Sequence, residues 1–149
     1  MKNFRIFIEP SPTQQSALRI LKSKSGKMFV GKMSNSKATK WKKEFIAKCL
    51  SHRPEKPYDF PLEVTIGFEY DYLKKHSAKE RKQILPKETR PDLDNLEKMV
   101  LDALVEAGFM VDDSLVAIKH SHKLFTGCPS ITIDMARFTW YTYDSSTHE

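Results

Sequence analysis

Four side chains in the second half of the sequence have the types and spacing needed for metal-assisted hydrolysis. Asp92 and Asp94 are two residues apart, just before a segment with helical periodicity, where extended backbone would turn both carboxylates to one side. Adjacent carboxylates repel each other, and a divalent cation is the usual compensation. Asp113 follows the helical segment. Lys98 lies one helical turn, about 6 Å, beyond Asp94, within reach of a bound phosphate or metal-bound water.

The same residues also have a purely structural interpretation. Asp94 and Glu97 have the spacing of a capping box, with Asp94 as the N-cap, and acids in a first turn complement the helix dipole. Asp94 and Lys98 have the spacing of a surface ion pair worth about a few tenths of a kcal/mol. For an isolated motif of this kind the structural interpretation is the commoner one. The second acidic pair, Asp112 and Asp113, favours a metal site.

Other motifs that use carboxylates or bind phosphates fit poorly. An EF-hand loop that began at Asp92 would need glycine at Glu97 and glutamate at Ala103. The sequence has no P-loop, no G-x-G-x-x-G run, and no sequence motif that pairs serine or cysteine with histidine. What remains is a hard-oxygen site that suits Mg²⁺, with Mn²⁺ as a substitute.

The charge distribution around this acidic segment suits a polyanionic partner. The chain has 149 residues and a formal net charge of +6. Residues 10–43 contain nine lysines or arginines and no acid, and residues 72–90 contain seven against two acids. Residues 92–113 reverse the balance, with seven acids and one lysine. Because each neutralised phosphate releases counterions, the two basic segments favour nucleic acid as the partner, with a solvated surface as the alternative.

Bulk features argue against a membrane or secreted protein. No apolar run approaches the length needed to span a bilayer, and the amino terminus lacks a secretory apolar region. Cys49 and Cys128 lie far apart, outside any metal-binding or redox spacing. They are typical of free thiols in a cytoplasmic protein.

Hydrophobic periodicity predicts a single α+β domain with a mixed β-sheet packed with helices, in the order β-α-β-(α)-α-β-β. We expect this domain at 1–138 and a C-terminal tail at 139–149. Gly108 is expected to end the last helix. The expected elements are strands at 4–9, 62–70, 115–125 and 131–135, helices at 38–49 and 93–107, a short basic helix between 77 and 86, and a loop or hairpin at 13–33.

The acidic segment also resembles a known family signature. In the RusA family of Holliday junction resolvases, D-x-D-N-x-x-K opens a helix and a pair of aspartates follows at a fixed spacing. A looser similarity of element order and basic loops extends over most of the chain. The dense match is carried by Asp92-Leu93-Asp94-Asn95-Leu96-Glu97-Lys98, then Asp102-Ala103-Leu104, Gly108 and Asp112-Asp113.

This resemblance implies a homodimeric, Mg²⁺-dependent endonuclease that cuts four-way DNA junctions by paired incisions in recombination and repair. By position, Asp92, Asp94 and Asp113 would be the metal-binding catalytic carboxylates and Lys98 the catalytic lysine. Asp112 would lie behind these ligands and contact them. The residues expected to bind DNA are Arg90, Lys87, Lys24, Lys27 and Lys32.

Two departures from the family pattern affect the expected DNA contacts. Pro91 stands where some members have a basic residue, so Arg90 takes that role or the role is absent. The Asn-Asn-Arg run of some members is also missing, so its contacts do not carry over. Two alternatives stay open: a nuclease for flaps or branched replication intermediates, and a non-catalytic DNA-binding module.

Overall fold

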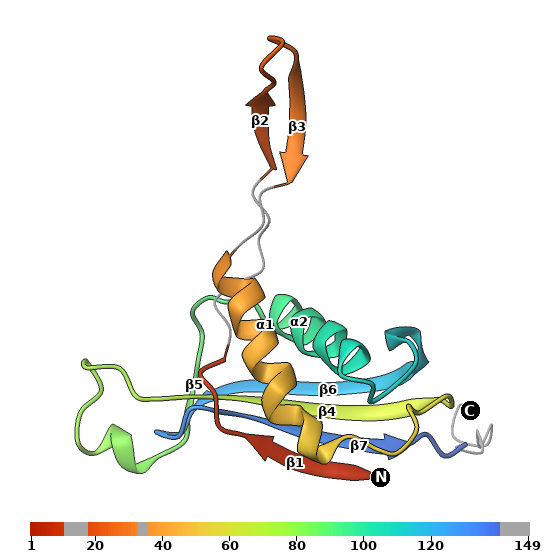
Figure 1. Ribbon diagram of the computed structural model, residues 1–149. Helices are drawn as coiled ribbons and strands as arrows, with labels where there is room; N and C mark the ends of the chain where they lie inside the picture. The colour runs from red at the N-terminus through yellow and green to blue at the C-terminus, as the bar shows by residue number, and fades with distance from the viewer. Residues whose placement is uncertain (11–17, 33–35, 141–149) are drawn as a thin grey trace, which may run out of the picture.

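The computed structural model describes residues 1–10, 18–32 and 36–140 (Figure 1). The described residues form one mixed sheet of five strands and a separate two-stranded sheet. The strands of the main sheet are β1 (Lys2–Ile6), β4 (Leu62–Tyr70), β5 (Leu85–Pro86), β6 (Val116–Phe125) and β7 (Ser130–Arg137).

The main sheet has the strand order β1-β7-β4-β6-β5. β4 and β6 run parallel, and every other neighbouring pair is antiparallel. A parallel pair needs a long crossover connection, and the segment between β4 and β6 supplies it. The predicted α+β domain with a mixed sheet, and its order of elements, are confirmed.

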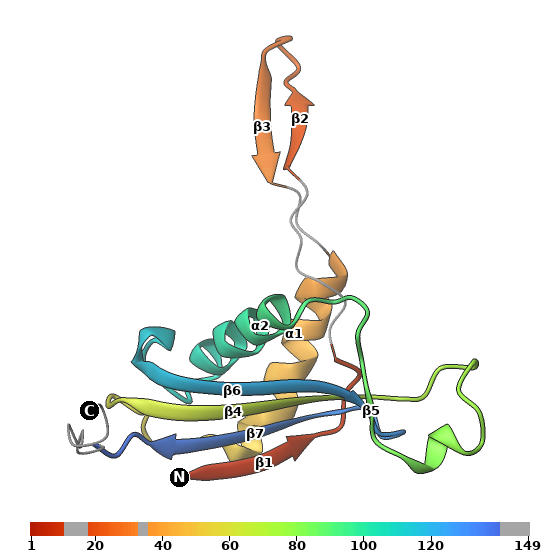
Figure 2. The ribbon, with the colours of Figure 1, turned by 180° about the vertical axis from the view of Figure 1, so that it is seen from behind.

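Two helices, α1 (Ser36–Cys49) and α2 (Leu93–Glu106), cover one face of this sheet (Figures 1 and 2). Alternate residues of β4 point to that face, because side chains alternate along a strand. No helix of the described residues covers the opposite face, where Glu63, Thr65 and Glu69 are only half-buried. The residues of β4 that are buried under the helices are Leu62, Val64, Ile66, Phe68 and Tyr70.

The apolar stripe predicted for the second helix is the buried face of α2. Leu96, Val100 and Leu104 are almost completely buried. Gly108 follows the helix with a φ of +81°, a conformation that glycine adopts without strain. The buried Phe109 then donates its backbone N–H to the carbonyl oxygen of Leu104, at 2.9 Å. The predicted glycine termination is therefore confirmed.

The segment predicted as a loop or hairpin forms a hairpin in its described part. β2 (Leu18–Lys22) pairs antiparallel with β3 (Met28–Lys32), and the two strands lie apart from the main sheet (Figure 1). Residues 11–17 and 33–35, which include part of this segment, lie outside the described residues.

The short basic helix predicted between 77 and 86 is only a 3-10 turn. η2 (Glu80–Lys82) is three residues long and is followed by β5. The capping signal itself is present, since Ser77 N donates to Glu80 Oε2 at 2.7 Å and Glu80 N donates to Ser77 Oγ at 3.2 Å. Two further 3-10 turns are η1 (Leu50–His52) and η3 (Asp113–Leu115).

Cys49 and Cys128 are both free, as predicted. Among the described residues, no helix is long and apolar enough to cross a membrane.

Candidate active site

The first turn of α2 carries two of the predicted metal ligands. Asp92 is the N-cap, with extended backbone (φ −71°, ψ 146°), and its carbonyl oxygen accepts the first helical hydrogen bond from Leu96 N at 3.2 Å. Asp94 lies within the first turn, and both aspartates are exposed. The Asp92 side chain makes no capping hydrogen bond, so its carboxylate remains available to a ligand.

This geometry corrects the capping-box interpretation. The helix begins at Leu93, so Asp92 and not Asp94 occupies the N-cap position. Extended backbone was expected for both aspartates, but only Asp92 has it, because Asp94 is already in the helix. Glu97 is not a cap. It is buried, forms an ion pair with Lys119, and accepts a hydrogen bond from Ser121 Oγ. Both partners lie on β6, so Glu97 fastens the first half of α2 to the sheet.

Residues just before α2 are held by a lysine whose role the sequence did not reveal. Lys123 Nζ donates to the carbonyl oxygens of Thr89 and Pro91, each at 2.8 Å. Lys123 lies near the end of β6 and within the face that α2 covers, since it pairs in register with the buried Phe68. The start of α2, with Asp92, is thereby fixed beside the end of β6. The signal available was the alternation of Lys119, Ser121 and Lys123, which places all three on one face.

The second acidic pair lies at the other end of the helix. Asp112 caps η3, because its Oδ1 accepts the backbone N–H of Ser114 at 2.8 Å. Hydrogen bonds from Ser114, through its side chain first and its backbone second, hold the pKa of Asp112 below its usual value. Asp113 is exposed within η3. Of the two neighbours, Asp112 is engaged in a local turn.

The two acidic groups are far apart within one chain. α2 has 14 residues, so at about 1.5 Å per residue its ends are about 20 Å apart. Asp92 and Asp94 lie at its start, whereas Asp113 follows its end and is the first residue of η3, which directly precedes β6. Among the described residues, no group of three or more histidine, cysteine or acidic side chains is placed to hold a metal ion. The structure therefore keeps Asp113 away from the two aspartates of its own chain.

Lys98 lies on the exposed side of α2, one turn after Asp94. In the part of the chain that the structure describes, the ion pairs do not include the expected pair between Asp94 and Lys98. Its ammonium group is consequently available to an anion that approaches the start of the helix.

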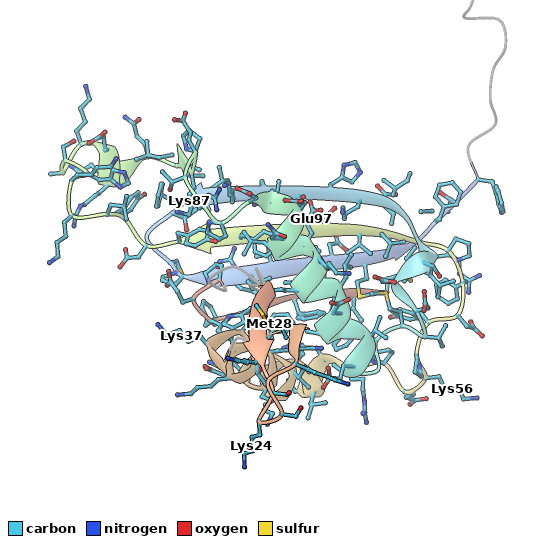
Figure 3. All side chains as sticks on the ribbon, turned by 90° about the horizontal axis from the view of Figure 1, so that it is seen from above. Lys24, Met28, Lys37, Lys56, Lys87 and Glu97 are labelled. Carbon is cyan, nitrogen blue, oxygen red and sulfur yellow. The ribbon has the colours of Figure 1, made fainter. Side chains whose placement is uncertain are left out.

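The expected DNA-binding residues fall into two groups. Lys24 and Lys27 are exposed at the turn of the hairpin, and Lys32 is the last residue of β3. Figure 3 shows Lys24 on the hairpin and Lys87 at the end of the main sheet. The exposed Arg90 is two residues before Asp92.

Lys87 differs from the exposed Lys24, Lys27 and Arg90 because it is partly buried. Its Nζ lies 4.8 Å from the ring centre of Tyr70 and 5.2 Å from that of Phe125, and it donates to Thr89 Oγ1 at 2.9 Å. Burial, followed by repulsion from Lys123, lowers its pKa. Lys87 therefore supports the local structure as well as adding positive charge.

Exposed carboxylates are able to hold a divalent metal for phosphodiester hydrolysis, and the basic segments on both sides suit a nucleic acid. The sequence model of the endodeoxyribonuclease RusA family matches residues 8–136. The chain belongs to this family, and it is therefore an endodeoxyribonuclease. Members act on junction DNA and generally depend on a divalent metal. Among curated proteins, none matches the chain.

Proposed function

We propose that the chain is a cytoplasmic, Mg²⁺-dependent enzyme that resolves four-way DNA junctions in recombination and repair as a homodimer, with Mn²⁺ able to replace Mg²⁺. The observation that carries this proposal is the separation of Asp92 and Asp94 from Asp113 by the length of α2. One chain supplies both halves of a carboxylate site, but at opposite ends of one helix.

A second copy of the chain resolves this separation. Two copies of α2 run antiparallel if a two-fold axis passes near the middle of the helix and perpendicular to it, so that the start of one lies beside the end of the other. Asp92 and Asp94 then meet Asp113 of the partner subunit, and the same set forms twice. A four-way junction also has approximate two-fold symmetry, so two equivalent sites suit two symmetric cuts.

The donor set of such a site fits the expected metal. Mg²⁺ prefers oxygen ligands and is usually bound through a few carboxylates while it keeps several waters. Asp92 and Asp94 are exposed, and the Asp92 side chain is not used for capping. When bound, the metal would lower the pKa of a water and offset negative charge on the phosphate.

The chain's own groups supply positioning and charge. Asp92 and Asp94 hold their carboxylates at the start of a helix that Glu97 and Lys123 fix to β6. Lys98, one turn further on, donates to a phosphate oxygen and stabilises the charge that develops there in the transition state. The exposed Lys24 and Lys27 of the hairpin bind phosphates outside the site, which makes affinity fall steeply with salt.

Subunit complementation tests the shared site directly. Asp92→Asn and Asp113→Asn homodimers are each expected to be inactive, because both of their sites are incomplete. A heterodimer of the two variants, isolated with two affinity tags, has one complete site and one site that lacks both residues. It should nick a four-way junction once, while a wild-type heterodimer with the same tags makes paired cuts.

Two outcomes would contradict the proposal. An inactive mixed heterodimer means that the carboxylates do not act across the dimer. Flap or duplex substrates cut as fast as four-way junctions by the wild-type protein mean that the junction is not the preferred substrate.

A further inference from the structure

A half-open cavity of about 400 Å³ lies at the end of the main sheet, between residues 73–80, β5 and the last residue of β6. Leu73, Leu85, Pro86 and Phe125 give it apolar walls. Nothing in the proposed cleavage chemistry uses it. We propose that this cavity binds one unpaired nucleobase of the branched DNA, close to the phosphate that is cut; this inference rests on the proposed function.

The imidazole ring of His76, which lines the cavity, is held in a fixed orientation. His76 stands edge-on to Phe125, with ring centres 4.8 Å apart and planes at 74°. Its Nδ1 accepts the backbone N–H of Leu73 at 3.0 Å, so the neutral ring carries its proton on Nε2. Flat rings with a fixed orientation are what stack on nucleobases without regard to sequence.

The segment that carries His76 is itself braced. Arg81 donates to the carbonyl oxygens of His76 and Leu73, at 3.0 and 3.2 Å. The Tyr72 hydroxyl donates to the carbonyl oxygen of Gln83 at 2.6 Å and closes the loop. A wall that is organised before the ligand arrives loses little conformational entropy on binding.

Polar groups in the lining suit the edge of a base. The carboxylates of Glu80 and Glu88 and the hydroxyl of Thr89 can accept hydrogen bonds from amino or imino N–H groups. Hydrogen bonds from Ser77 hold the pKa of Glu80 below its usual value, and an ionised carboxylate only accepts hydrogen bonds. Lys75, also in the lining, supplies a cation for the attached phosphate.

The cavity is close to the candidate active site along the chain. Thr89 lines it and is three residues before Asp92, and three residues span at most about 10 Å. Lys123 holds the Thr89 carbonyl and so fixes this distance. Bases are about 3.4 Å apart along a strand, so the base that enters must lie within a few nucleotides of the cleaved phosphate. Bases at a branch point open more readily than those within a duplex.

Junction-binding affinity, measured without metal, tests this inference. A single abasic residue is placed in turn at each position around the branch of a four-way junction. Wild-type protein should bind the junction about ten-fold more weakly when one particular position is abasic, and equally well otherwise, because stacking of one base is lost. His76→Ala and Leu73→Ala should weaken binding of the intact junction by a similar factor, with no further loss at that abasic position. His120→Ala, an exposed histidine on the opposite sheet face, should behave as wild type.

Two results would overturn the inference: no abasic position that weakens wild-type binding, or an abasic loss that persists undiminished in His76→Ala and Leu73→Ala. Circular dichroism and thermal melts establish that both variants are folded before binding is compared. Cleavage of the intact junction by the wild-type protein tests the proposed function separately, because the abasic comparison reads binding alone.

Discussion

Each end of α2 carries a pair of acidic residues, but only the pair at its start is left wholly to an outside ligand. At its start, Asp92 sits at the N-cap position but makes no capping hydrogen bond, and Asp94 is exposed beside it. Beyond its end, Gly108 terminates the helix and Asp112 is hydrogen-bonded to Ser114. Of the pair beyond the end, Asp112 is therefore used in a local turn and Asp113 is exposed, while both carboxylates at the start are left to an outside ligand.

This difference separates structural acids from candidate catalytic ones. Carboxylates at a helix start are stabilised by the dipole, so their presence alone says nothing about function. What distinguishes Asp92 and Asp94 is that, among the residues the structure describes, neither side chain forms an ion pair and the Asp92 side chain forms no cap. Glu97, in the same helix, makes two such contacts and is buried.

The largest effect is expected for Asp94→Asn. The substitution keeps the shape of the side chain but removes the negative charge that a metal ligand needs, so metal-dependent cleavage should fall roughly a thousand-fold or more. Junction binding should persist or improve, because a negative charge near the DNA phosphates has been removed. Cleavage rates and gel-shift affinities measured on the same junction check both parts.

Asp102→Asn is the matched control for Asp94→Asn. Asp102 lies in the middle of the same helix and is partly buried. Its removal should leave cleavage within a few-fold of wild type. Equal losses in the two variants would mean that the total charge of α2 matters and that its start is not special.

The next largest effect is expected at Lys98. Lys98→Ala should lower the rate of cleavage about a hundred-fold at saturating junction, because one cationic donor to the transition state is lost. Single-turnover kinetics separate this from binding, which should change little. Lys98→Arg should recover part of the rate, whereas a variant that fails through misfolding would not be rescued in this way.

The helices, the strands and their ends could be predicted from the sequence where a local pattern of residues determines them. The alternation in β4 and the Gly108 termination are examples, because side-chain direction and left-handed backbone are local properties. The contacts of Glu97 could not be predicted, because only the packing of α2 on β6 brings Lys119 and Ser121 next to it. The distance from Asp94 to Asp113 could not be predicted either, because the number of residues between two positions does not say how the chain folds back between them.

A moderate effect on stability is expected at Glu97. Glu97→Gln keeps an acceptor for Ser121 but loses the ion pair with Lys119, whose side chain is 39% exposed. Solvent weakens such a pair, so the free energy of unfolding should fall by about 1 kcal/mol. Urea denaturation of Glu97→Gln, Lys119→Met and the double variant measures the coupling free energy between the two side chains. Strictly additive losses would show that the pair contributes nothing, and cleavage at saturating metal should change little in each.

The smallest effect is expected for Asp112→Ala. Its hydrogen bonds lower the pKa of Asp112 in the folded state, so they stabilise the fold above the unfolded value of 3.8 and are lost as pH falls through the lower folded value. The variant should therefore melt slightly below wild type at pH 7, with a difference that narrows below pH 4. Asp112→Asn keeps an acceptor and should recover most of the loss.

Cleavage by the same variant separates the two neighbouring aspartates. Asp112→Ala should cut junctions within a few-fold of wild type, whereas Asp113→Ala should be inactive. Equal inactivity of both would mean that Asp112 also serves the metal site and that its hydrogen bond to Ser114 positions a ligand. In that case both aspartates beyond the end of α2 would serve the site, as both aspartates at its start do, and the contrast between the two ends would disappear.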